Sequence, residues 1–175
     1  MARTIERAWA NEAAAGGILG GAAYLAFTMF MGLLAGGVEG LVMPPRMIGA
    51  MVLGEQALQP AYAASTAIVV GVVIHFGLSV GFALLFIALA QPVSTMRSTN
   101  TLLVTASIYG LVLWLVNFYV VAAVFGWPWF AEQTNPLVQF LGHTYFYGWV
   151  LGMHLSRYAT VVPEPPPARK AMSSR

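Results

Sequence analysis

Apolar residues occupy this chain in four long runs, without the regularly spaced charged positions of a soluble amphipathic helix. The runs cover approximately residues 14–42, 66–90, 102–125 and 137–158. At 1.5 Å per residue, each run is long enough to cross a hydrocarbon core of about 30 Å. They are too long and too continuous for the alternating strands of a membrane β-barrel. The pattern predicts an all-α fold, an integral membrane four-helix bundle.

The last two runs form a hairpin around one aromatic turn, GWPWFAEQTNP, with Asn117 and His143 as polar residues inside it. The second and fourth runs then point the same way, and each contains a histidine followed by glycines, in HFGLSVG and HTYFYG. This match suggests two hairpins in parallel repeat, an arrangement that many membrane proteins use.

Residues 43–62 are predicted to connect the first two spans, because Pro44 and Pro45 should end the first helix. Within this connection we expect a short interfacial helix in the first outer loop, with Met43, Met47 and Met51 at spacings of four. Methionine commonly fills gaps between apolar groups. A Cu(I) site is the alternative, because thioethers suit this soft ion.

Three segments make up the predicted domain organisation. Residues 1–13 form a cytoplasmic N-terminal interfacial segment that carries Trp9, and residues 14–160 form the four-span transmembrane domain. Residues 161–175 form a disordered, proline-rich cytoplasmic tail, because such a composition cannot bury a core. We expect no cleaved signal peptide, because the first apolar run exceeds the usual signal core.

The cationic residues predict the orientation. Of eight Lys and Arg residues, seven fall on one side of the spans and Arg46 alone falls on the other. The seven are Arg3, Arg7, Arg97, Arg157, Arg169, Lys170 and Arg175. The positive-inside rule places both termini in the cytoplasm. The outer side then receives Glu39, Glu55 and Glu132, with Trp127 and Trp129 in an aromatic belt.

Glycines recur at spacings of four, which lets neighbouring helix backbones approach closely in lipid. The glycines that we expect to pack helices are Gly16, Gly20, Gly32, Gly36, Gly77, Gly81, Gly148 and Gly152. Their partners lie either within the chain or on another membrane subunit.

His75, Asn117 and His143 should share one depth, roughly 4 to 6 Å outside the bilayer midplane at 1.5 Å per residue. In one interpretation they hydrogen-bond each other, or Ser79, Tyr145 and Tyr147, across helix contacts. In a second, His75 and His143 are axial ligands of a b-type haem. In a third, the polar layer is part of a proton or ion path toward the outer glutamates. His154 is expected at the cytoplasmic interface.

Composition excludes several kinds of chemistry. The chain is 59% hydrophobic and 8% charged, whereas soluble proteins are about 25% charged. It has no cysteine and no aspartate, which excludes disulfides, thiolate metal sites and a Ser-His-Asp triad. The outer glutamates are too few for a di-metal carboxylate site. The net charge of +2 is too small to indicate nucleic acid. We expect no catalytic residues.

Three stretches, PPRMIGAMVLGEQAL, HFGLSVGFALLF and HTYFYGWVLG, resemble a loose group of small, uncharacterised bacterial inner-membrane proteins with four spans. The resemblance covers about half of the chain and omits the aromatic turn and the proline-rich tail. It implies an address in the bacterial inner membrane and the four-span plan, and it brings no activity.

The sequence therefore favours a non-catalytic accessory or assembly subunit of a larger bacterial membrane complex, such as a respiratory complex. Its partners would be the lipid bilayer and other integral membrane subunits. The alternatives are a redox protein that binds haem b or a metal through His75 and His143, and a small transporter or channel.

The predicted orientation can be tested by labelling the two chain ends in intact cells. A reagent that does not cross the membrane should label neither end until the membrane is permeabilised, because both ends should face the cytoplasm. Ends found on opposite sides would contradict an even number of crossings.

Overall fold

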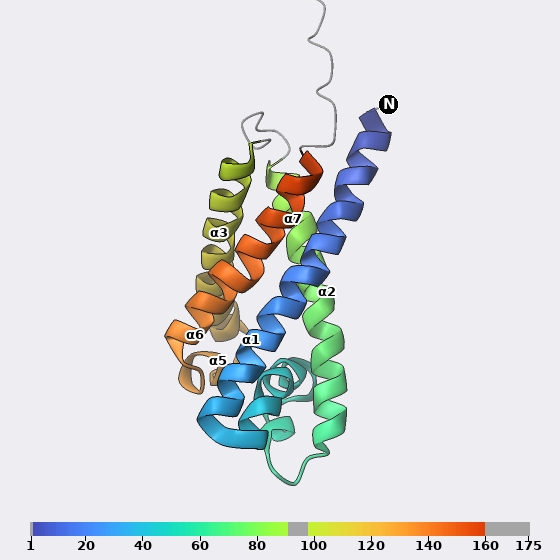
Figure 1. Cartoon of the computed structure of the whole chain (residues 1–175). Helices are drawn as coiled ribbons and strands as arrows, with labels where there is room; N and C mark the ends of the chain where they lie inside the picture. The colour runs from blue at the N-terminus through green and yellow to red at the C-terminus, as the bar shows by residue number, and fades with distance from the viewer. Residues whose placement is uncertain (1, 91–97, 160–175) are drawn as a thin grey trace, which may run out of the picture.

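The computed structural model describes the backbone of residues 2–90 and 98–159, and the side chains of these residues from residue 8 onward. The proline-rich segment and Arg97 lie outside the described residues. In the described part every regular element is a helix (Figure 1). The order is α1 (Ala2–Leu53), η1 (Glu55–Leu58), α2 (Ala64–Ala90), α3 (Thr99–Leu115), η3 (Val116–Val121), α4 (Ala122–Phe125), α5 (Trp129–Glu132), α6 (Pro136–Leu141), η4 (Gly142–Trp149) and α7 (Val150–Ala159).

Three helical runs are long and apolar enough to cross a membrane. They are Ala8–Leu53, Ala64–Ala90 and Thr99–Phe125, and their mean hydropathy is 1.8, 2.4 and 2.2. Many large apolar side chains on them face outward, which suits lipid and not water; Val73 is 68% exposed and Val124 is 75% exposed. The chain is thus a helical membrane protein. The fourth predicted run is helical over residues 136–159, but it is divided among α6, η4 and α7.

The first long helix breaks at two glycines and not at the two prolines. Gly36 has φ −138° and Gly37 has φ 63° with ψ −147°, and the chain then continues as helix to Leu53 with Pro44 and Pro45 inside it. The prediction that the prolines end the helix is therefore wrong. Glycine accepts a positive φ without the steric cost that a Cβ brings, so the reversal occurs at Gly37. The short helix expected in the first loop is the second part of α1, residues 38–53.

α1 lies between two neighbours because its glycines leave room on two faces. A Cβ on Gly17 would lie 2.7 Å from the carbonyl oxygen of Ser79 on α2, and one on Gly20 would lie 2.9 Å from that of Tyr147 on η4. A Cβ on Gly152 of α7 would lie 2.8 Å from the carbonyl oxygen of Leu102 on α3. The helices are therefore packed in the order α2, α1, η4–α7 and α3, which Figure 1 also shows.

The packing glycines predicted from the sequence fall into two groups. Five have close neighbours: a Cβ would meet backbone within 3 Å at Gly20, Gly32, Gly148 and Gly152, and the ends of the Leu151 and His154 side chains at Gly16. Gly36, Gly77 and Gly81 have no atom within 4 Å of a Cβ built on them. These three do not pack closely within the described part of the chain, because Gly36 lies at the break in α1 and the other two face away from the bundle, so packing on another subunit stays a prediction for them.

Buried apolar side chains form two clusters, one toward each end of the bundle. The larger, which we call the inner cluster, contains Ala13, Ala83, Phe86, Ile87, Ala90, Leu102, Ala106, Leu113, Tyr147, Leu151 and Leu155. The outer cluster contains Met47, Ala50, Ala57, Ala67 and Trp129. The indole Nε1 of Trp129 donates to the carbonyl oxygen of Met47 at 3.3 Å. Trp129 is only 3% exposed, so its predicted place in an aromatic belt is wrong.

The first described residues and the end of α7 lie at the same end of the bundle (Figure 1). α1 is continuous from Ala2, so the expected N-terminal interfacial segment is the first part of that helix. Trp9 meets Tyr158 edge to face, with ring centroids 4.9 Å apart. Nε2 of His154 lies 2.9 Å from Oε2 of Glu12. These contacts join the start of α1 to α7, so His154 lies at the same end of the bundle as the start of α1.

Substituting single glycines of α2 tests this packing. A Cβ at Gly71 would collide with the carbonyl of Pro45, whereas one at Gly77 meets nothing within 4 Å. Gly71→Ala should lower the free energy of unfolding by about 1–3 kcal/mol, because backbone must move. Gly77→Ala is the matched control and should leave it unchanged or raise it by up to about 1 kcal/mol. Thermal unfolding in one detergent measures both, and equal effects would contradict the packing order.

Candidate functional site: a cavity between the two apolar clusters

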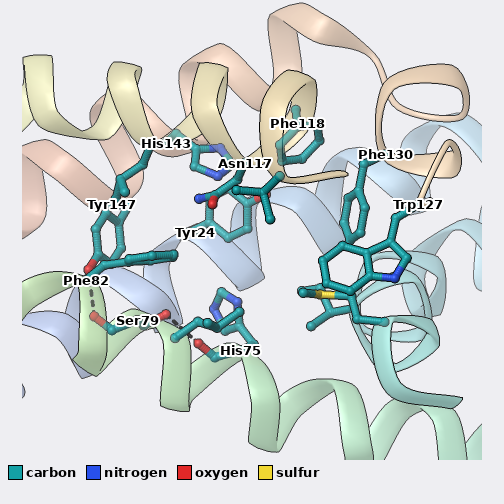
Figure 2. A pocket seen from close by; sticks show the side chains of 15 residues that line it. Tyr24, His75, Ser79, Phe82, Asn117, Phe118, Trp127, Phe130, His143 and Tyr147 are labelled. Carbon is teal, nitrogen blue, oxygen red and sulfur yellow. Dashed lines mark hydrogen bonds between the residues drawn. The ribbon is translucent and has the colours of Figure 1, made fainter. Parts of the chain in front are cut away.

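A cavity of about 400 Å³ separates the inner cluster from the outer cluster. Its polar lining residues are Tyr24, His75, Ser79, Asn117, His143 and Tyr147, and the remaining lining is apolar except for the indole N–H of Trp127. Trp127 and Phe130 line its outer end, and Phe82 and Tyr147 line its inner end (Figure 2). The three residues that the sequence placed at one depth, His75, Asn117 and His143, therefore face one space.

Two π-helical segments supply much of this lining. η3 contributes Asn117, Phe118 and Val121, and η4 contributes His143 and Tyr147. In a π-helix the backbone bonds run from i to i+5, which widens the turn, and such segments often occur at functional sites. α1 and α2 contain no assigned π segment, so the two predicted hairpins differ in this detail.

A chain of hydrogen bonds connects three helices along the inner side of the cavity. The hydroxyl of Tyr147 donates to the backbone carbonyl oxygen of Ser79 at 2.6 Å. The hydroxyl of Ser79 donates to the backbone carbonyl oxygen of His75 at 2.7 Å. Nε2 of His75 lies 2.8 Å from the carbonyl oxygen of Gly21 on α1. Ser79 and Tyr147 thus bridge helices, and their hydroxyls are already used.

The ring of Tyr24 lies between the two histidines (Figure 2). It stacks on His75 with centroids 5.5 Å apart and an interplanar angle of 19°, and it meets His143 edge-on at 4.6 Å. Its hydroxyl donates to Oε1 of Gln139 at 2.7 Å, while Nδ1 of His143 lies 2.9 Å from the carbonyl oxygen of the same Gln139. Tyr24 is therefore fixed at the centre of the site.

This geometry does not fit a haem held by His75 and His143. Axial ligation needs both imidazoles to face one iron across an open gap. Here the Tyr24 ring fills the space between them, and Nε2 of His75 is bonded to Gly21. Among the described residues there is also no group of three or more His, Cys, Asp or Glu side chains that could hold a metal ion.

The three methionines at spacings of four do not face one common site in the structure. Met47 is buried in the outer cluster with Met43 packed against it, whereas Met51 lines the cavity. This is the behaviour of methionine as an apolar filler. The outer glutamates of the predicted ion path, Glu39, Glu55 and Glu132, do not line this cavity.

Asn117 differs from the other polar lining residues, because its side chain has no hydrogen-bond partner in the described part of the chain. The buried side-chain oxygen atoms without a partner there are those of Ser107 and Thr144, so the Asn117 amide keeps accessible surface. Figure 2 shows Asn117 beside Tyr24 and His143 at the cavity. In an apolar setting an unpaired amide costs roughly 1–3 kcal/mol by mutational measures.

A second cavity of about 370 Å³ adjoins the first at Tyr24. The two share Tyr24, Ile48, Phe118 and Phe130 as lining. The second is more polar and is lined by Thr28, Gln133, Thr134, Asn135 and Gln139 among others. The Tyr24–Gln139 hydrogen bond therefore lies where the two cavities meet.

Sequence reasoning missed Tyr24, Gln139 and Arg46. Each is a single polar residue within an apolar stretch, which is the signal that identified His75 and Asn117. The sequence predicted only the side of the membrane on which Arg46 lies, and the structure shows that its side chain is just 9% exposed. Its guanidinium donates to the carbonyl oxygens of Ala57 at 2.8 Å and Gln59 at 2.9 Å, and so holds η1 against α1.

Comparisons with protein-family models, with curated proteins and with solved structures find no match for this chain.

Proposed function

We propose that the protein is a non-catalytic, four-span protein of the bacterial inner membrane whose cavity binds a neutral amphiphile dissolved in the bilayer. Residues 136–159 would be the fourth crossing, because they pack along α1 and α3 and end beside the first described residues of α1. The charge distribution supports cytoplasmic termini.

The observation that carries the ligand proposal is the unpaired amide of Asn117 in a cavity whose lining is otherwise mostly apolar. Ligand sites of this kind combine an apolar wall with a few polar groups that fix orientation. An amphiphile satisfies both, because its body replaces empty space and its head pairs with the amide.

The cavity also has a route to the bilayer. α2 and α3 meet through Tyr109, whose hydroxyl donates to the carbonyl oxygen of Phe82 at 2.8 Å and whose ring lies 5.2 Å from that of Phe86. Leu78 both lines the cavity and is 39% exposed, so this one side chain lies between the cavity and the lipid-facing surface. A ligand entering between these helices would come from lipid.

Filling the cavity should abolish binding. Val121→Trp places an indole in the lining, whereas Val120→Trp places it at a neighbouring position that is 56% exposed. We expect the unmodified protein and Val120→Trp to retain farnesol, a fifteen-carbon alcohol, in native mass spectrometry, and Val121→Trp to lose at least tenfold in affinity, roughly 1.4 kcal/mol. Equal retention by all three proteins would contradict binding in this cavity.

A second candidate function, an accessory subunit of a larger membrane complex, is supported by the outer face of α2. Gly77 and Gly81 are open there, with Val73 and Leu84 exposed beside them. Small residues at such spacing allow another membrane helix to approach closely.

Bulky substitutions on this face test the accessory role. The double substitution Gly77→Leu and Gly81→Leu should release a co-purifying membrane subunit. Each new side chain would keep the backbone of the partner's helix from approaching α2. Val104→Leu, on the exposed face of α3, is the control and should retain it. Native-mass analysis after gentle extraction measures the complex. A lone monomer from the unmodified protein would argue against this role.

A further inference from the structure

The hydrogen bonds made by the two cavity histidines determine which ring nitrogen carries the proton. Nε2 of His75 lies 2.8 Å from the carbonyl oxygen of Gly21, and Nδ1 of His143 lies 2.9 Å from that of Gln139. A carbonyl oxygen can only accept, so each of these nitrogens must be the N–H donor. In neutral imidazoles, the remaining nitrogens, Nδ1 of His75 and Nε2 of His143, are then acceptors with a free lone pair.

Neither acceptor nitrogen has a protein partner in the described part of the chain. Neither is among the fully buried unpartnered atoms, which there are Ser107 Oγ and Thr144 Oγ1. Both nitrogens therefore keep accessible surface on residues that line the cavity. The carbonyl oxygen of the Asn117 side chain is a third unpaired acceptor.

The hydroxyl donors around these nitrogens are already used. The hydroxyls of Tyr24 and Tyr147 donate to Gln139 and Ser79, and the hydroxyl of Ser79 donates to His75. Among the described lining residues of both cavities there is no Lys, Arg, Asp or Glu. The described lining of the first cavity thus carries no formal charge and has unpaired acceptors on His75, Asn117 and His143, while its unpaired donors are the NH₂ of Asn117 and the indole N–H of Trp127.

We propose that the ligand is an uncharged amphiphile that carries a hydroxyl group and donates that proton to His75, Asn117 or His143. This deepens the proposed function and rests on it. A ketone, ester or ether head could accept from Asn117 or Trp127, but it has no proton to donate and would leave the lone pairs of both histidines unpaired. A phosphate head would bring negative charge to a lining without a cation. A prenyl alcohol and a quinol share the required chemistry.

A matched pair of probes separates the donor requirement from binding itself. Farnesol and farnesyl methyl ether have the same chain, but only farnesol has a hydroxyl proton. With the full chain in nanodiscs, and empty discs as the correction for partitioning, we expect farnesol to bind roughly three- to tenfold more tightly, the effect of one hydrogen bond. Decylubiquinol should likewise bind more tightly than decylubiquinone, by a similar factor. Whether farnesol or decylubiquinol has the higher affinity then distinguishes a prenyl alcohol from a quinol as the ligand.

Variants locate the acceptor. The ratio of the affinity for farnesol to that for its methyl ether should fall to about one in a triple variant with His75→Phe, Asn117→Leu and His143→Phe. The affinity for the ether should change little. Asn100→Leu, at an exposed position of α3, is the control and should keep the preference. Equal binding of farnesol and its ether, or a preference that survives the triple variant, would overturn the hydroxyl requirement and leave the proposed function standing. Binding of neither probe would overturn both.

Discussion

Backbone contact along the glycine faces of α1 is the constraint on which the rest of the bundle depends. Gly17 and Gly21 admit α2, and Gly16 and Gly20 admit η4 and α7 on the adjacent face. Lipid tails supply no hydrophobic drive between helices, so such close van der Waals contact is a main source of association. The same approach brings the ring of His75 within reach of the Gly21 carbonyl, where a side chain on Gly21 would meet Ser79.

The cavity follows from where this close packing ends. The inner cluster closes the bundle at one end, and the folded-back part of α1 with Trp129 closes it at the other. Between them, the wider turns of η3 and η4 carry Asn117 and His143 past the ideal helical positions. In an apolar medium each polar group needs a partner. All the polar lining residues except Asn117 use at least one polar group in a bond to another residue.

The outer end is built from protein contacts and not from membrane-anchoring side chains. Arg46 bonds to carbonyl groups at the end of η1, and Trp129 bonds to the carbonyl of Met47. Both side chains would normally mark a water or headgroup boundary. Their burial instead joins α1, η1 and α5 into one cap over the cavity, so residues that resemble surface anchors in the sequence are structural.

The sequence alone determined the class of the protein, the positions of α2 and α3, and three of the polar residues that line the cavity, His75, Asn117 and His143. Length and hydropathy suffice for this, because a lipid-spanning helix satisfies its backbone within itself and needs no long-range information. It did not locate the break at Gly37, because two adjacent prolines were the stronger local signal. Tertiary structure alone decided that Tyr24 separates the histidines, that Gly77 faces outward and that Trp129 is buried. Each of these depends on which faces of the helices meet, and in a uniformly apolar span no polar face marks that choice.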